Sequence, residues 1–134
     1  MVIKIDTLSP VPIYMQLRNQ VIIGIASKKL ETGEALPSAR RLSADLGINL
    51  HTVNKAYSLL IDEGYIAIDR RSGTFVSQPG KNEDKIKFKL SESLYLTAAE
   101  AICHSVTEKD FIELCLINYK KAQNYSLEKE QEEK

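Results

Sequence analysis

Residues 38–64, SARRLSADLGINLHTVNKAYSLLIDEG, carry the signals of two helices joined by a short turn. Ser38 is a favourable N-cap residue for the first helix, and Gly47 is the residue type that often follows a helix C-terminus. Asn49 can cap a second helix, which we expect to continue to Glu63. The pair predicts a helix-turn-helix, whose second helix can place its N-terminal residues in the major groove of DNA.

Another helix is expected before this pair. Pro10 and Pro12 suit the first turn of a helix, because the N–H that proline lacks would have no partner there. The helix is expected to end near Lys28 and Lys29. Its apolar stripe consists of Ile13, Leu17, Val21 and Ile25.

After the pair, the apolar periodicity changes from helical to strand-like. Residues 65–68 and 74–77 are two short β-type runs, and the loop 69–73 between them ends in Gly73, which can adopt positive φ. This order predicts a mainly α fold with a small β-hairpin, namely a winged helix-turn-helix domain over residues 1–78.

The remainder is expected to be mostly helical. A linker over residues 79–89 precedes a two-helix region over 90–125; its first helix should reach Val106, and Thr107 should cap the second. Residues 126–134 are too polar to order themselves and should fray. Two short amphipathic helices cannot bury both apolar stripes without a partner surface, so this tail is expected to form a homodimer. The assigned interface residues are Leu94, Ala98, Ile102, Val106, Phe111 and Leu114.

The composition is that of a globular protein whose net charge creates no strong electrostatic field. Of the 134 residues, 43% are hydrophobic and 27% charged, and 18 basic side chains balance 18 acidic ones. Residues 1–80 carry nine basic and seven acidic side chains (net +2), and residues 81–134 carry nine and eleven (net −2). With no bilayer-length apolar run and no visible export signal, we expect a cytoplasmic protein without a membrane partner. Affinity for DNA must therefore come from local patches.

No pattern indicates a catalytic or metal site. The two histidines, His51 and His104, lie far apart, and no nucleophile–base arrangement or glycine-rich phosphate loop is present. We expect neither an enzyme nor a cofactor. Cys103 and Cys115 lack zinc-site spacing and are expected to be small buried apolar residues. A redox pair, or a metal sensor that includes His104, are the alternatives.

Polar and basic residues gather at three places that suit DNA: the start of each helix of the pair and the tip of the hairpin. Helix N-termini attract phosphate, and a compact basic tip can reach a backbone or an adjacent minor groove. The candidate DNA-binding residues are Ser38, Arg40, Asn49, Leu50, His51, Thr52, Asn54, Lys55, Arg70, Arg71 and Gly73.

Each place also has a simpler interpretation. Asn49 could serve only as a cap, His51 could be an ordinary surface histidine, and Arg40 with Arg41 could form a solvated face. A winged helix could also serve protein–protein contact without DNA. The coincidence of basic residues at all three places favours DNA binding.

Five segments in order resemble the GntR family of bacterial regulators, and specifically its short YtrA-like subfamily. The resemblance covers about residues 10–78. The segments are Pro12-Ile13-Tyr14, Gly33-Glu34-Ala35-Leu36-Pro37-Ser38-Ala39-Arg40, Thr52-Val53-Asn54-Lys55-Ala56-Tyr57, Glu63-Gly64-Tyr65-Ile66 and Gly73-Thr74-Phe75-Val76.

The resemblance implies DNA contacts from Ser38 and Arg40, recognition-helix roles for Asn49, His51 and Thr52, and a wing tip at Gly73. Two departures leave the operator sequence open. Leu50 stands where the family often has arginine or proline, and Asn54 stands where many members have a basic residue.

The resemblance also implies that the roughly fifty residues after the wing form two short dimerisation helices. A two-fold dimer would bind an inverted-repeat operator and repress by blocking polymerase. Its own operon and neighbouring transporter genes are the implied targets, and any small-molecule effector is unknown. Leu59 and Ile61, apolar where the family usually has solvent-facing residues, are expected to pack against the tail or a partner.

Overall fold

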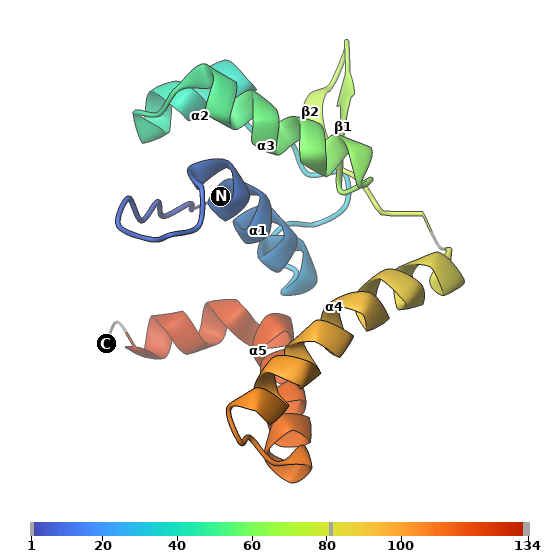
Figure 1. Cartoon of the computed structure of the whole chain (residues 1–134). Coiled ribbons are helices and arrows are strands. Elements are labelled where there is room, and N and C mark those ends of the chain that lie inside the picture. Colours follow the sequence, from blue (N-terminus) through green and yellow to red (C-terminus); the bar gives the residue numbers. More distant parts are fainter. Residues whose placement is uncertain (1, 81, 133–134) are drawn as a thin grey trace. The chain divides into compact units, whose positions relative to one another are not determined.

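The computed structural model describes the backbone of residues 2–80 and 82–132, and the side chains of residues 2–80 and 82–124. The chain forms two compact units, one built mainly on the residues up to Pro79 and the other on Gly80–Asn124. In chain order the elements are α1 (Ile13–Ala26), α2 (Ala39–Leu46), α3 (Leu50–Asp62), β1 (Ile66–Asp69), β2 (Gly73–Val76), α4 (Glu83–Cys103) and α5 (Glu108–Glu132) (Figure 1).

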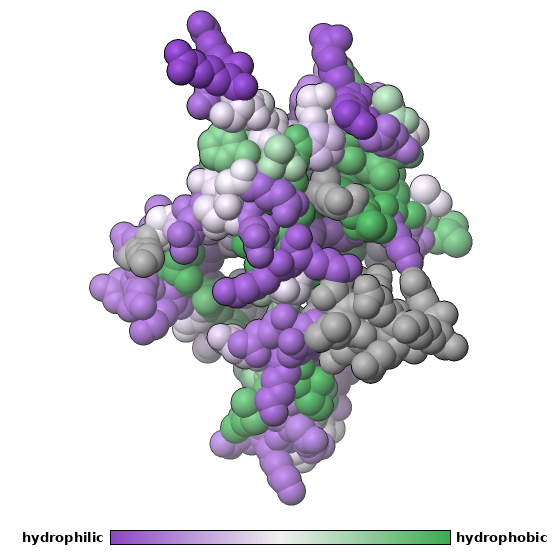
Figure 2. Space-filling view, turned by 180° about the vertical axis from the view of Figure 1, so that it is seen from behind, coloured by the Kyte–Doolittle hydropathy of each residue, from purple (hydrophilic) through white to green (hydrophobic). Residues whose placement is uncertain are grey.

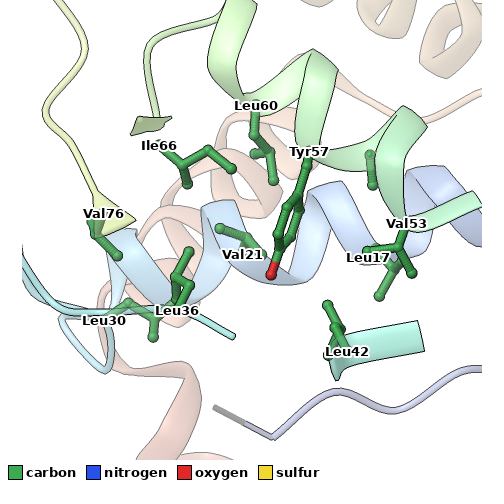
Figure 3. Close-up of a cluster of buried hydrophobic side chains, with 11 residues drawn as sticks. Leu17, Val21, Leu30, Leu36, Leu42, Val53, Tyr57, Leu60, Ile66 and Val76 are labelled. Atoms are coloured by element: carbon green, nitrogen blue, oxygen red, sulfur yellow. The ribbon is translucent and has the colours of Figure 1, made fainter. Parts of the chain in front are cut away.

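The first unit is organised around α3, which packs against α1, α2 and β1. Apolar residues three and four positions apart give α3 one buried face. The ring of Tyr57 points into the core between side chains of α1 and α3 (Figure 3). The buried hydrophobic residues are Leu17, Val21, Leu30, Leu36, Leu42, Val53, Ala56, Tyr57, Leu60, Ile66 and Val76.

Local capping bonds define the helix-turn-helix as the sequence predicts. Ser38 Oγ accepts a hydrogen bond from the backbone N–H of Arg41 at 3.2 Å, so it caps α2. Gly47 ends that helix at φ +65°, in the left-handed region that glycine adopts without steric cost. Asn49 Oδ1 accepts from the N–H of His51 at 2.8 Å and caps α3.

The wing is more extensive than a hairpin. β1 and β2 pair antiparallel, with Asp69 opposite Gly73, so a three-residue loop joins them. In addition, the N–H of Leu36 donates to the carbonyl of Thr74 at 2.8 Å. An isolated bridge pairs Ala35 with Phe75. The chain before α2 thus borders β2 through an isolated bridge and backbone hydrogen bonds, a pairing that no local sequence pattern predicts.

Two glutamines of α1 hold the N-terminal segment by its backbone. The Gln20 side chain accepts from the N–H of Lys4 at 2.9 Å and donates to its carbonyl at 2.6 Å. Gln16 exchanges the same pair of bonds with Asp6, both at 2.9 Å. The segment is therefore tied to α1 by hydrogen bonds like those between strands.

The second unit has no buried residue among its described side chains. Thr107 Oγ1 accepts from the N–H of Asp110 at 3.2 Å, which confirms the predicted cap of α5. Cys103 and Cys115 are both exposed, so the expectation of buried cysteines is wrong. The residues around them have no core in which a side chain could be buried.

Three predicted boundaries in the part of the chain after the wing are also wrong. The linker is shorter than 79–89, because Asn82 caps α4 and two acidic residues favour its first turn. Val106 lies after α4, since Ser105 leaves the helix at φ +62°. The backbone of α5 continues to Glu132, with non-helical dihedral angles at Asn124, where fraying from residue 126 is expected. Leu, Glu, Lys and Gln in this stretch are all good helix formers. Residues 133 and 134 of the predicted frayed tail lie outside the described residues.

Candidate nucleic-acid interface

The two faces of α3 differ in chemistry. Opposite its buried face, exposed side chains form a polar surface that starts at His51 and includes Asn54 and Lys55. Ser58 is exposed one turn after Asn54 and continues this surface, although the sequence analysis does not select it. Its position four residues after Asn54 was the signal that could have identified it. A helix with such a face can present hydrogen-bonding groups to base edges in a major groove.

Three other candidates at the start of α3 have less of their side chains available to a ligand. Asn49 is exposed, but its amide oxygen is occupied by the cap, so its NH₂ group is the part left for a ligand. Leu50 and Thr52 are half-buried. They can contribute at most part of their side chains to a surface contact.

At the start of α2, the candidate cation is Arg40. It is exposed, and none of the ion pairs found among the described residues involves it. Its neighbour Arg41 lies 3.8 Å from Asp45, one helical turn on. Because Ser38 Oγ already accepts a backbone N–H, that hydroxyl retains its proton for donation to an acceptor such as phosphate.

The wing tip carries the third set. Arg70 and Arg71 are exposed in the loop between the strands, and Gly73 follows at φ +71°. Asp69 Oδ1 accepts from the N–H of Arg71 at 2.8 Å, which stabilises the turn. Hydrophilic side chains project from the end of the hairpin, and a separate group projects over α2 (Figure 2). All three predicted sets therefore belong to one unit, and each is open to solvent.

Buried contacts hold these surfaces in place. The Tyr57 hydroxyl donates to the carbonyl of Pro37 at 2.7 Å, and this bond fastens the start of α2 to α3. Burial of the phenol raises the pKa of Tyr57 to about 12, because the phenolate would lose its hydration.

One contact at the site is absent from the sequence analysis. The Lys55 ammonium nitrogen lies 4.0 Å from the centroid of the Tyr14 ring, which belongs to the first turn of α1. This distance is within the range of a cation–π interaction. The two residues are 41 positions apart, so no local sequence pattern could have predicted the pairing.

Other kinds of site find no support in the described part of the chain. No group of three His, Cys, Asp or Glu side chains there could hold a metal ion. None of the helices described is long and apolar enough to cross a bilayer.

A helix-turn-helix with a bordered wing and an exposed polar recognition helix defines the class of winged-helix DNA-binding proteins. The family described as "Bacterial regulatory proteins, gntR family" matches residues 13–76. The chain is 30% identical over 83 residues to the HTH-type transcriptional regulator YhcF of Bacillus subtilis, covering 62% of this chain and 69% of YhcF. The chain belongs to the GntR family, which confirms the resemblance seen in the sequence.

Further similarities extend this result. The repressor YtrA of Bacillus subtilis is 38% identical to this chain over 79 residues, which are 59% of this chain and 61% of YtrA. The solved structure of YtrA from Sulfolobus acidocaldarius, a GntR-family transcription factor, is 38% identical with a TM-score of 0.58, covering 71% of this chain and 99% of that one. A transcriptional antiterminator from Listeria monocytogenes, 23% identical, shares the fold over 92% of this chain and 93% of its own, with a TM-score of 0.84. The family and these relatives are regulators rather than enzymes.

Proposed function

We propose that the chain is a homodimeric repressor that binds an inverted-repeat DNA operator. The observation that carries this proposal is the exposed polar face of α3, together with the exposed cations Arg40 of α2 and Arg70 of the wing in the same unit. These surfaces supply hydrogen-bond donors for bases and positive charge for phosphates. The relative YtrA is named a transcriptional repressor, which supports repression rather than activation.

The second unit supports the homodimer. Leu94 is 51% exposed and Ile102 is 75% exposed, which is unfavourable for side chains of this size in a single chain. Ala98, Val106 and Phe111, by contrast, are half-buried within one chain. The large exposed hydrophobic residues of the unit are Ile86, Phe88, Leu90, Leu94, Tyr95, Leu96, Ile102, Ile112, Leu114, Leu116, Ile117 and Tyr119.

These apolar residues lie on more than one side of α4. Ile86, Leu90 and Leu94 follow one another at four-residue spacing, whereas Phe88 and Tyr95 lie on the other side of the helix. A helix that is apolar around much of its circumference is normally enclosed by several neighbours. Figure 2 shows hydrophobic surface on this unit between hydrophilic groups. Two copies that pair α4 and α5 would provide such an enclosure.

Pairing also follows from the charge of the chain. Because the residues up to position 80 carry a net charge of only +2, one copy has few phosphate contacts to offer. Two linked copies bind their half-sites at high effective concentration, which raises affinity without new kinds of contact. Repression would follow from occupation of an operator that overlaps a promoter. The protein would act in the bacterial cytoplasm. Its proposed targets are its own operon and neighbouring transporter genes.

The test is selection of DNA from a random-sequence pool by the purified chain, followed by binding titrations on the selected site across a salt series. We expect an inverted repeat with half-sites about one helical turn apart or slightly more. Arg40→Gln and Arg70→Gln should each weaken binding and lower the log–log salt slope by about 0.9, as expected for one lost phosphate contact.

Lys29→Gln is the matched control, since Lys29 is an exposed cation beyond the end of α1 and outside the three surfaces. It should change neither affinity nor slope by more than the measurement error. If no sequence is enriched and binding shows no salt dependence, the proposal is wrong and a role in protein–protein contact is favoured.

A further inference from the structure

We infer that Tyr14 is a positioning residue for DNA binding, which holds the Lys55 ammonium over its ring and directs it at a phosphate. The inference rests on the proposed function. Its basis is the 4.0 Å distance between the Lys55 nitrogen and the Tyr14 ring centroid. The Tyr14 ring is partly buried and packs against the hydrophobic core, while Lys55 is exposed on α3.

The ring can position the cation because its own place is determined by the core. α1 and α3 are in direct contact, so the ring of Tyr14 and the backbone of Lys55 belong to two helices that pack against each other. A free lysine has four flexible bonds and loses much rotamer freedom when it binds a phosphate. A lysine already held over a ring has lost part of that freedom before the ligand arrives.

An aromatic ring also leaves the charge available. None of the ion pairs found among the described residues includes Lys55, so its ammonium is not neutralised by a carboxylate. The face of a ring attracts a cation through its quadrupole but carries no net charge. The remaining N–H groups and the full positive charge can therefore act on a phosphate oxygen.

The experiment is a double-mutant cycle on the selected operator, with Tyr14→Leu, Lys55→Met and the double variant. Tyr14→Leu should weaken binding about two- to five-fold, the effect of a cation–π contact at an exposed site. The salt slope should stay at the wild-type value, because Lys55 still reaches its phosphate. Lys55→Met should weaken binding and also lower the slope by about 0.9. In the Lys55→Met background, Tyr14→Leu should have no further effect.

Two measurements separate positioning from a structural role. Tyr14→Phe retains the ring and should restore wild-type affinity, whereas a structural role of the hydroxyl would leave it impaired. In the NMR spectrum without DNA, the Lys55 ε-CH₂ protons should be shifted upfield by the ring, and the shift should vanish in Tyr14→Leu. If Tyr14→Leu does not fold, the comparison of Tyr14→Phe with Tyr14→Met takes its place, since methionine fills similar space without a ring.

The outcomes are distinct. Wild-type affinity in folded Tyr14→Leu, or an equal loss in both Lys55 backgrounds, overturns the inference and leaves the proposed function intact. A wild-type chain that shows the ring-induced shift but binds no DNA with salt dependence overturns the proposed function, and the role of Tyr14 with it.

Discussion

Arg18 of α1 and Glu63 at the end of α3 form a two-pronged ion pair, with Nε 2.7 Å from Oε1 and Nη2 2.5 Å from Oε2. Both side chains are partly buried, at 19% and 21% exposure. The hydrogen bonds to Glu63 are the main cause that raises the pKa of Arg18 above its usual value, against the opposing effect of burial. The planar fork of arginine matches a carboxylate, so the pair joins the C-terminal end of the recognition helix to α1.

Glu63→Gln is therefore expected to lower the free energy of unfolding by about 1–2 kcal/mol, because Arg18 keeps its partial burial but loses its charged partner. Denaturant titration measures the change. Asp62→Asn is the control, since Asp62 is exposed on the same helix, and its effect should stay within about 0.5 kcal/mol. Equal stability of the two variants would show that the pair contributes nothing.

The buried phenol of Tyr57 predicts a stability loss at alkaline pH. Its pKa is raised from 10.0 to about 12, so between these values the folded chain retains a proton that the unfolded chain has released. The stabilisation is fully present below pH 10 and declines as the pH rises toward 12, by up to about 2–3 kcal/mol. Unfolding free energies measured at pH 9 and pH 11.5 should show the decline in the wild type.

Tyr57→Phe supplies the comparison. It should cost about 1 kcal/mol at neutral pH, because the carbonyl of Pro37 loses its hydrogen bond. Its free energy of unfolding should decrease less between pH 9 and pH 11.5 than that of the wild type. An identical pH dependence in both proteins would mean that Tyr57 is not the group responsible.

The turn of the helix-turn-helix depends on a left-handed glycine. A Cβ added to Gly47 meets no atom within 4 Å, so the only obstacle to alanine is the φ of +65°. Gly47→Ala should lower the unfolding free energy by about 1 kcal/mol, and Gly47→Asn by less, because asparagine tolerates this region better. Thermal unfolding of the three proteins gives the order directly, and a stability of Gly47→Ala equal to the wild type would contradict the strain.

At Lys28, the reverse substitution, which introduces a glycine, is expected to stabilise the chain. This lysine follows α1 at φ +63°, where a glycine is the usual residue. Lys28→Gly should raise the unfolding free energy by about 0.5–1 kcal/mol, since relief of steric strain exceeds the added freedom of the unfolded chain. Lys29→Gly, at the next position, should not stabilise. A destabilised Lys28→Gly would show that the lysine side chain makes a contribution larger than the strain.

The proposed dimer predicts that a charge on the apolar side of α4 weakens association. Leu94→Asp should raise the dimer dissociation constant at least about 100-fold, because an unpaired carboxylate would have to be buried. Sedimentation equilibrium measures this constant. Ser93→Asp introduces the same charge at an exposed polar position roughly 100° around α4 from Leu94 and should change the constant little. Equal behaviour of both variants, or a monomeric wild type, would rule out this interface.

The sequence by itself determined the features that depend on neighbouring residues. Ser38, Asn49 and Thr107 cap their helices, and Gly47 and Gly73 take up left-handed conformations, because capping and turn geometry involve groups a few positions apart. The start of α4 carried such a local signal as well, in Asn82 and the acidic residues after it. Pro79 and Gly80 beside it are typical of a linker, and they obscure this helix start in the sequence.

Only the tertiary structure decided which distant groups meet. The pairing of Ala35 with Phe75, the contact of Tyr14 with Lys55 and the ion pair of Arg18 with Glu63 each join segments about 40 or more residues apart. Such contacts depend on how helices and strands pack, and many sequences with the same periodicity would pack differently. The exposure of Cys103 likewise follows from the absence of buried side chains among the described residues of its unit. The sequence identified the DNA-binding class, and the packing determined how its candidate cations are held.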